Sequence, residues 1–85
     1  MIKTYRKTTT IQAEQFEGLL RQRVDYRIKY DRLASHSDNA PRYVMPTLEG
    51  DMGLQLGDWI ATGVKGEHWS IVDDVFKASY VEVAE

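Results

Sequence analysis

Cysteine is absent from this chain of 85 residues. The absence excludes disulfides, thiolate metal sites and a cysteine nucleophile, and it fits a reducing compartment. Histidine is scarce as well, with two in the sequence, so we expect neither a metal nor a cofactor. A chain this short is expected to form one domain over residues 1–85 with a thin core. Because no covalent link reinforces that core, we expect a homo-oligomer.

Long apolar runs are missing too. No stretch approaches the roughly 18–20 consecutive apolar residues of a membrane span. The opening MIKTYRKTTT lacks the apolar centre of a signal peptide. The expected location is therefore the cytoplasm of the cell that makes the protein, with no membrane partner.

Excess positive charge is also lacking, since the net charge at pH 7 is −2. This balance argues against general nucleic-acid binding. The charge is unevenly placed: residues 1–43 hold nine Lys/Arg against five Asp/Glu, whereas residues 44–85 hold two against eight. Such polarity suits head-to-tail association or a local site for phosphate.

Catalytic signatures are few. Neither the Gly-x-Ser-x-Gly elbow nor the Gly-x-x-x-x-Gly-Lys phosphate loop occurs in the sequence. The best acid–base candidates are Glu67 and His68, but neighbours in a strand point to opposite faces and do not readily serve one reaction centre. The sequence therefore predicts a protein that is not an enzyme.

What the chain does have is a glycine-punctuated segment at residues 56–71, LGDWIATGVKGEHWSI. Aromatic and β-branched residues flank its glycine-bearing tip, which predicts a β-hairpin. A two- or four-residue tip places Trp59 on one face with His68, whereas a three-residue tip with a bulge places Trp59 with Trp69. Turn chemistry favours the first arrangement.

The rest of the chain is also predicted to be mostly extended. Pattern and turn residues predict strands over Lys7–Phe16, Arg42–Leu48, Met52–Leu56 and Tyr80–Val83. Residues 19–33 alternate in a way that favours a strand, although their leucines and arginines suit a helix. Asp73 and Asp74 are expected to cap a single helical turn over Val75–Ser79, anchored by Phe76.

These elements together predict a mainly β (α+β) fold. We expect a small antiparallel sheet or β-roll of about five to six strands with a short C-terminal helical turn.

The order TIQAEQFEG, PTLEGDM, GDWIATGVKGEHW and DDVFKASYVEV resembles a common group of small phage and prophage proteins. The resemblance covers about residues 8–18 and 46–83, with Ser79 where the group has threonine; residues 19–45 match no fixed pattern. It implies an accessory phage protein without an agreed biochemical activity. Such proteins often act against host defences, an expectation that derives from the genes that lie beside theirs in phage genomes.

The residues suggest two kinds of binding function, and the resemblance implies their targets. The first is capture of a small anionic ligand, with Trp59 as a stacking plate beside His68, and with Lys65 and Arg42 meeting phosphate; the resemblance implies a nucleotide-derived immune signal as that ligand. The second is a protein–protein module that blocks a host defence factor or is a minor virion or assembly component. Phosphodiester cleavage with His68 as the base, and nucleic-acid binding through the arginines of residues 21–32, are weaker alternatives.

Overall fold

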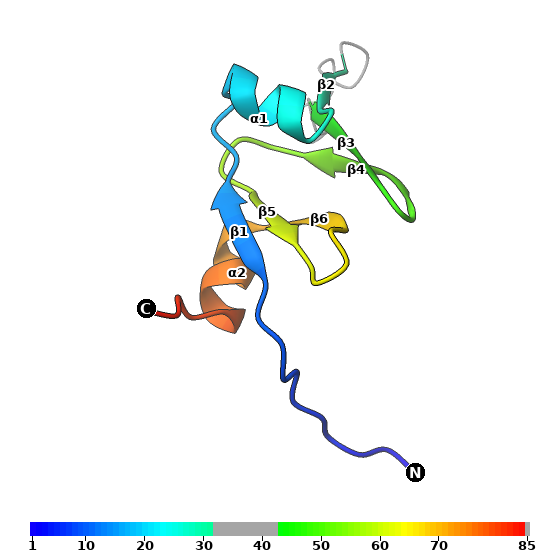
Figure 1. Ribbon diagram of the computed structural model, residues 1–85, viewed down its shortest axis with the longest axis vertical. Coiled ribbons are helices and arrows are strands. Elements are labelled where there is room, and N and C mark those ends of the chain that lie inside the picture. Colours follow the sequence, from blue (N-terminus) through cyan, green and yellow to red (C-terminus); the bar gives the residue numbers. More distant parts are fainter. Residues whose placement is uncertain (32–42, 85) are drawn as a thin grey trace.

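The computed structural model of the protein describes residues 1–31 and 43–84. This part of the chain holds six strands and two short helices (Figure 1). Their bounds are β1 Gln12–Gln15, α1 Leu20–Asp25, β2 Lys29–Tyr30, β3 Tyr43–Thr47, β4 Gly50–Leu54, β5 Trp59–Thr62, β6 His68–Ile71 and α2 Asp73–Ser79. The mainly β architecture with a short helix near the C-terminal end confirms the predicted fold class. In these residues no helix has the length and apolar character needed to cross a membrane.

Two antiparallel sheets form the body of the molecule. The first has the strand order β1-β5-β6 and the second β2-β3-β4. The sheets meet where the Ser70 N–H of β6 donates to the Met52 sulfur of β4, 3.1 Å away, and the Ser70 hydroxyl donates to the Gly53 carbonyl. Helix α2 lies on the other side of the first sheet, against Trp59 (Figure 1).

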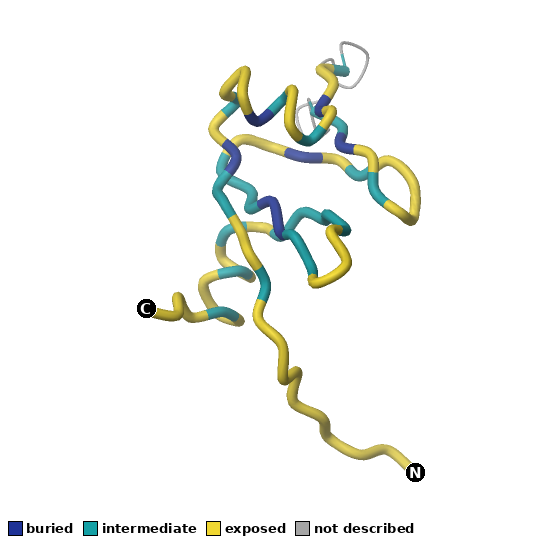
Figure 2. Tube along the Cα trace, in the orientation of Figure 1, coloured by how far each residue is buried: buried dark blue, intermediate teal, exposed yellow. Residues whose placement is uncertain are grey.

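The hydrophobic core is small and lies between the two sheets, where Figure 2 shows most of the buried positions. Its members come from both sheets and from the segments beside them: Phe16, Ile28, Met45, Leu54 and Ile60. Burial of these side chains is the main apolar contribution to stability, because few other large side chains are shielded from water.

Phe16 joins the two sheets. Its N–H donates to the Asp58 carbonyl at 2.7 Å, and its carbonyl accepts the Gly57 N–H at 2.9 Å, which extends the β1–β5 pairing by one residue. Its fully buried ring meets the Tyr43 ring of β3 edge-to-face at 5.0 Å. The position thus fixes the distance between the sheets.

The β5–β6 hairpin has the three-residue tip rather than the favoured two- or four-residue tip. The Gly63 N–H donates to the Glu67 carbonyl at 2.9 Å, so residues 64–66 form the tip. Gly66 has φ of 82°, the left-handed conformation that glycine adopts without a steric cost. A three-residue tip with a bulge needs a glycine only at its last position, and Gly66 occupies that position.

The register reverses the predicted facing of the hairpin. Ala61 pairs with Trp69 and Thr62 pairs with His68, and paired residues share a face of an antiparallel sheet. Trp59, two residues from Ala61, therefore lies with Trp69. His68 lies on the opposite face, toward the second sheet.

Residues 19–33 were expected to form a strand, and for most of this range the expectation was wrong. Helix α1 occupies Leu20–Asp25, and only Lys29–Tyr30 pair as β2. The helix is held by the side chain of Gln22, which is buried against β1. Arg27, with φ of 58°, turns the chain after the helix. Tertiary hydrogen bonds outweighed the local alternation.

The C-terminal segment also differs from the prediction. Residues 80–84 form no strand, and α2 is longer than one turn. Val72 is the residue before the helix, so Asp73 and Asp74 lie in its first turn and do not cap it through their side chains. Their negative charges interact favourably with the positive end of the helix dipole. Phe76 does pack inward as expected, onto Trp59.

Candidate ligand-binding pocket

A pocket of about 390 Å³ lies between the turns of the two sheets. It is bounded by the segment after α1, the β3–β4 turn and the β5–β6 turn. Its lining residues are Asp25, Tyr26, Arg27, Pro46, Thr47, Leu48, Gly66, Glu67 and His68. The volume falls at the lower end of the roughly 300–1,000 Å³ typical of small-molecule sites.

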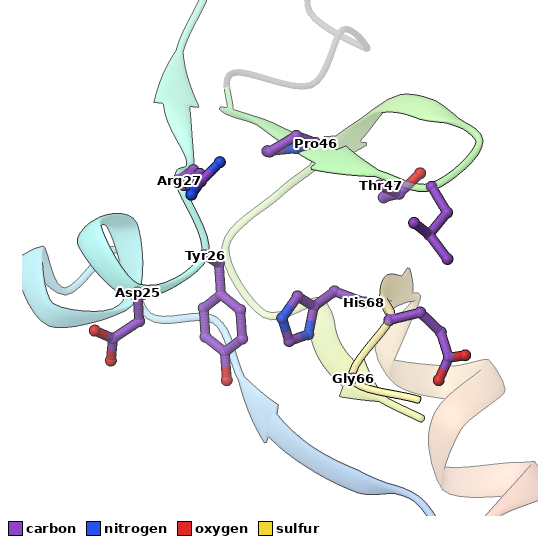
Figure 3. Close-up of a pocket in the computed structure, with 9 residues that line it drawn as sticks. Asp25, Tyr26, Arg27, Pro46, Thr47, Gly66 and His68 are labelled. Atoms are coloured by element: carbon purple, nitrogen blue, oxygen red, sulfur yellow. The ribbon is translucent and has the colours of Figure 1, made fainter. Parts of the chain in front are cut away.

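Two aromatic rings form one wall of the pocket. Tyr26 and His68 meet edge-to-face with ring centroids 5.0 Å apart. Figure 3 shows these rings side by side, with Arg27 above Tyr26 and with Pro46 and Thr47 of β3 across from His68. A ligand in the pocket would meet the two rings, the end of β3 and the arginine that follows Tyr26.

The two carboxylates around the pocket already have partners. Asp25 pairs with Arg21 at 3.5 Å, and in Figure 3 its carboxylate points away from His68. Glu67 accepts the Lys65 backbone N–H at 3.3 Å, inside the β5–β6 tip. These bonds engage both carboxylates outside the pocket, which reduces their repulsion of an incoming anion.

The cationic side of the pocket is not engaged in this way. The Arg27 side chain forms no ion pair or hydrogen bond with the residues that the structure describes, and its backbone N–H donates to the Val24 carbonyl at 3.3 Å. The His68 Nδ1 lies 2.9 Å from the Thr62 hydroxyl, and within the described ranges its Nε2 has no partner. When Thr62 donates to Nδ1, the proton of the neutral ring is on Nε2. The pocket then offers five guanidinium donors and one imidazole donor to an acceptor-rich ligand.

Tyr26 is held in place by a hydrogen-bond network around Glu14 of β1. Its hydroxyl donates to Glu14 at 2.5 Å, and Arg21 and Gln22 of α1 donate to the same carboxylate at 2.6 and 2.9 Å. The hydrogen bonds from Arg21, Tyr26 and Gln22 lower the pKa of Glu14 to about 2. Burial and the bond to Glu14 raise the pKa of Tyr26 to about 12. Tyr26 is therefore a neutral donor, fixed to β1, over the usual pH range.

This network predicts an acid-sensitive step in stability. The folded-state pKa of Glu14 is below its usual value of 4.5, so the stabilisation is complete above that value and is lost as the pH falls toward 2. The shift corresponds to roughly 3 kcal/mol at most, and solvent screening of a side chain that is 32% exposed reduces the loss to about 1–2 kcal/mol.

Urea unfolding measured between pH 5 and pH 2 checks this expectation. Glu14→Gln should flatten the pH dependence in that window, whereas the exposed neighbour substitution Glu17→Gln should retain it. An unchanged slope in Glu14→Gln would mean that other carboxylates carry the acid sensitivity.

Trp59 was predicted to line the ligand site, and the structure places it elsewhere. Its indole N–H donates to the Asp73 carboxylate at 2.8 Å, and its ring stacks on Phe76 at a centroid distance of 4.2 Å. The bond to Trp59 is the main cause that lowers the pKa of Asp73, followed by Lys77. Trp59 thus anchors α2 on the face opposite His68.

The other predicted residues are divided as well. Lys65 is exposed at the β5–β6 tip and does not line the pocket. Arg42 lies outside the described residues. His68 does line the pocket, together with Glu67. The expectation that Glu67 and His68 face apart is met, because the Glu67 carboxylate lies beside Gly63 and Trp69, on the face of the hairpin opposite His68.

Sequence reasoning missed most of the pocket wall. Tyr26 and Arg27 were assigned to the strand expected over residues 19–33. The left-handed conformation at Arg27 has no sequence mark, because such positions usually carry glycine or asparagine. For Pro46 and Thr47, at the end of β3, the turn was visible in the sequence but its proximity to the β5–β6 tip was not.

No protein family, curated protein or solved structure matches this chain. Across residues 1–31 and 43–84, the structure contains no group of three or more His, Asp or Glu residues placed to hold a metal ion. The pocket is therefore interpreted from its own geometry.

Proposed function

We propose that the protein is a small phage or prophage accessory protein that captures an anionic small molecule without chemical conversion. The observation that carries the proposal is the pocket itself, which is lined by Tyr26, His68 and Arg27, whose guanidinium has no partner among the described residues. An anion would gain a charge-assisted hydrogen bond from the guanidinium. The volume suits one ring with one anionic group better than a dinucleotide.

The biological setting of the proposal rests on the sequence resemblance. Accessory phage proteins often counter host defences, and a nucleotide-derived immune signal has both a flat ring and phosphate. Capture of such a signal would lower its free concentration in the host. The alternative role, a module that blocks a host defence protein, is distinguished by the experiment below.

The experiment is thermal unfolding with a panel of nucleoside phosphates, cyclic nucleotides and aromatic carboxylates. A ligand whose free concentration is one hundred times its Kd adds about 2.7 kcal/mol to the free energy of unfolding. For a domain of this size, that raises Tm by roughly 10–20 °C. Arg27→Gln should abolish most of the shift, because it removes the guanidinium and keeps much of the side-chain length. Lys65→Gln is the matched control and should keep the shift.

The outcomes separate the candidate functions. Recovery of the bound compound unchanged, by mass spectrometry after incubation, supports capture; its conversion would contradict a non-catalytic role. No shift with any compound, together with stoichiometric co-purification of a host protein, would favour the protein–protein module instead. Equal loss of the shift in both variants would place the site away from Arg27.

A further inference from the structure

The first eleven residues form an extended arm that leaves the body of the molecule (Figure 1). Residues 1–10 are all exposed and contain no helix or strand. Among them are three large apolar or aromatic side chains that the rest of the chain does not cover: Met1, Ile2 and Tyr5, the last 85% exposed. Side chains of this kind are stabilised when another surface covers them.

The dimensions of the molecule reflect this arm. The radius of gyration is 14.4 Å, whereas a compact chain of the same length would have about 12 Å. The arm therefore reaches beyond the volume that the fold fills, and its apolar side chains lie where a second molecule can meet them.

A second uncovered surface lies at the other end of the chain. We call it the α2–tail surface, and it comprises α2, the residue before it and residues 80–84. It exposes four valines, of which Val81 is 90% exposed: Val72, Val75, Val81 and Val83. The arm and this surface are each apolar and each uncovered in a single copy.

The charges of the two surfaces are complementary. The arm carries Lys3, Arg6 and Lys7, and no acidic residue precedes Glu14. Lys7 lies over the Trp69 ring at 5.6 Å, so Lys3 and Arg6 are the arm's available cations. The α2–tail surface carries Asp74 and Glu82, neither of which forms an ion pair within the described ranges.

We propose that the arm of one copy docks on the α2–tail surface of a second copy, and that the exchange is reciprocal in a two-fold dimer. The arm and the tail leave the first sheet in different directions (Figure 1), so a partner is better placed than the same chain to receive the arm. Docking covers Ile2 and Tyr5 with the exposed valines and sets Lys3 and Arg6 against Asp74 and Glu82. The proposal does not depend on the pocket.

The test is a charge exchange between two chains. The first variant combines Lys3→Glu with Arg6→Glu, and the second combines Asp74→Lys with Glu82→Lys. Light scattering at tens of micromolar should give twice the 9.8 kDa chain mass for the natural protein. Each variant alone repels its own copies, so its dissociation constant should rise at least tenfold. A one-to-one mixture restores both contacts and should return the dimer.

A third variant, with all four substitutions in one chain, completes the design. It should dimerise by itself, because its arm and its α2–tail surface are again complementary. If the mixture stays monomeric, the arm folds back on its own chain or does not dock, and the proposal is wrong. A monomeric natural protein, or a dimer that neither variant weakens, would overturn it as well. Unchanged far-ultraviolet circular dichroism should show that the exposed substitutions leave the fold intact.

Discussion

Replacing Phe16 with alanine is expected to lower the free energy of unfolding by about 3–5 kcal/mol. The side chain is fully buried, and its ring contacts Tyr43 edge-to-face at 5.0 Å. Its removal leaves a cavity at the junction of the two sheets, and the backbone there is fixed by the bonds to Gly57 and Asp58. A domain of this length has a total stability of about 4–13 kcal/mol, so the variant would lose a large part of it.

Urea unfolding followed by tryptophan fluorescence measures the effect of Phe16→Ala. The matched control is Leu20→Ala, because Leu20 is also a large apolar residue but is 73% exposed on α1. This control should change the free energy of unfolding by less than about 0.5 kcal/mol. A loss below 1 kcal/mol in Phe16→Ala would show that the sheets are not joined through this ring.

The strands that the sequence predicted well are those with strong local signals. In β5 and β6, turn residues mark the ends of the strands and aromatic or β-branched residues fill them. The segments of β1, β3 and β4 were predicted from the same signals. The register was harder to predict, because the two-residue, three-residue and four-residue tips all end at Gly66. A one-residue shift moved Trp59 to the face of α2 and left His68 with the pocket.

The pocket was largely hidden for a different reason. It is assembled from three turns that are distant in the sequence, and its shape depends on how the two sheets face each other. Helix α1 contributes Asp25 to the lining, and Tyr26 and Arg27 follow directly after the helix. The helix forms because Gln22 finds hydrogen-bond partners on β1. These partners come from a distant strand, so no local sequence pattern predicts them. His68 was identified because it is a lone histidine beside a predicted hairpin tip.

Substitution of Gln22 by leucine is expected to lower the free energy of unfolding by about 3 kcal/mol. Gln22 is 1% exposed. Its amide accepts the Glu17 N–H at 2.9 Å and donates to the Gln15 carbonyl at 2.8 Å and to Glu14 at 2.9 Å. Leucine has a similar volume but leaves these groups unsatisfied, and each unmade bond costs roughly 1–3 kcal/mol. The loss should appear first in α1, as faster amide hydrogen exchange.

The effect should extend to the pocket, because Gln22 and Tyr26 both donate to Glu14. Tyr26→Phe combined with Gln22→Leu should cost less than the sum of the single substitutions, with a coupling of about 0.5–3 kcal/mol. Gln12→Leu, at an exposed position of β1, serves as the control and should be nearly neutral. Strict additivity, or equal losses in Gln22→Leu and Gln12→Leu, would mean that α1 is held by apolar contacts alone. In that case the position of Tyr26 in the pocket wall would not depend on the Glu14 network.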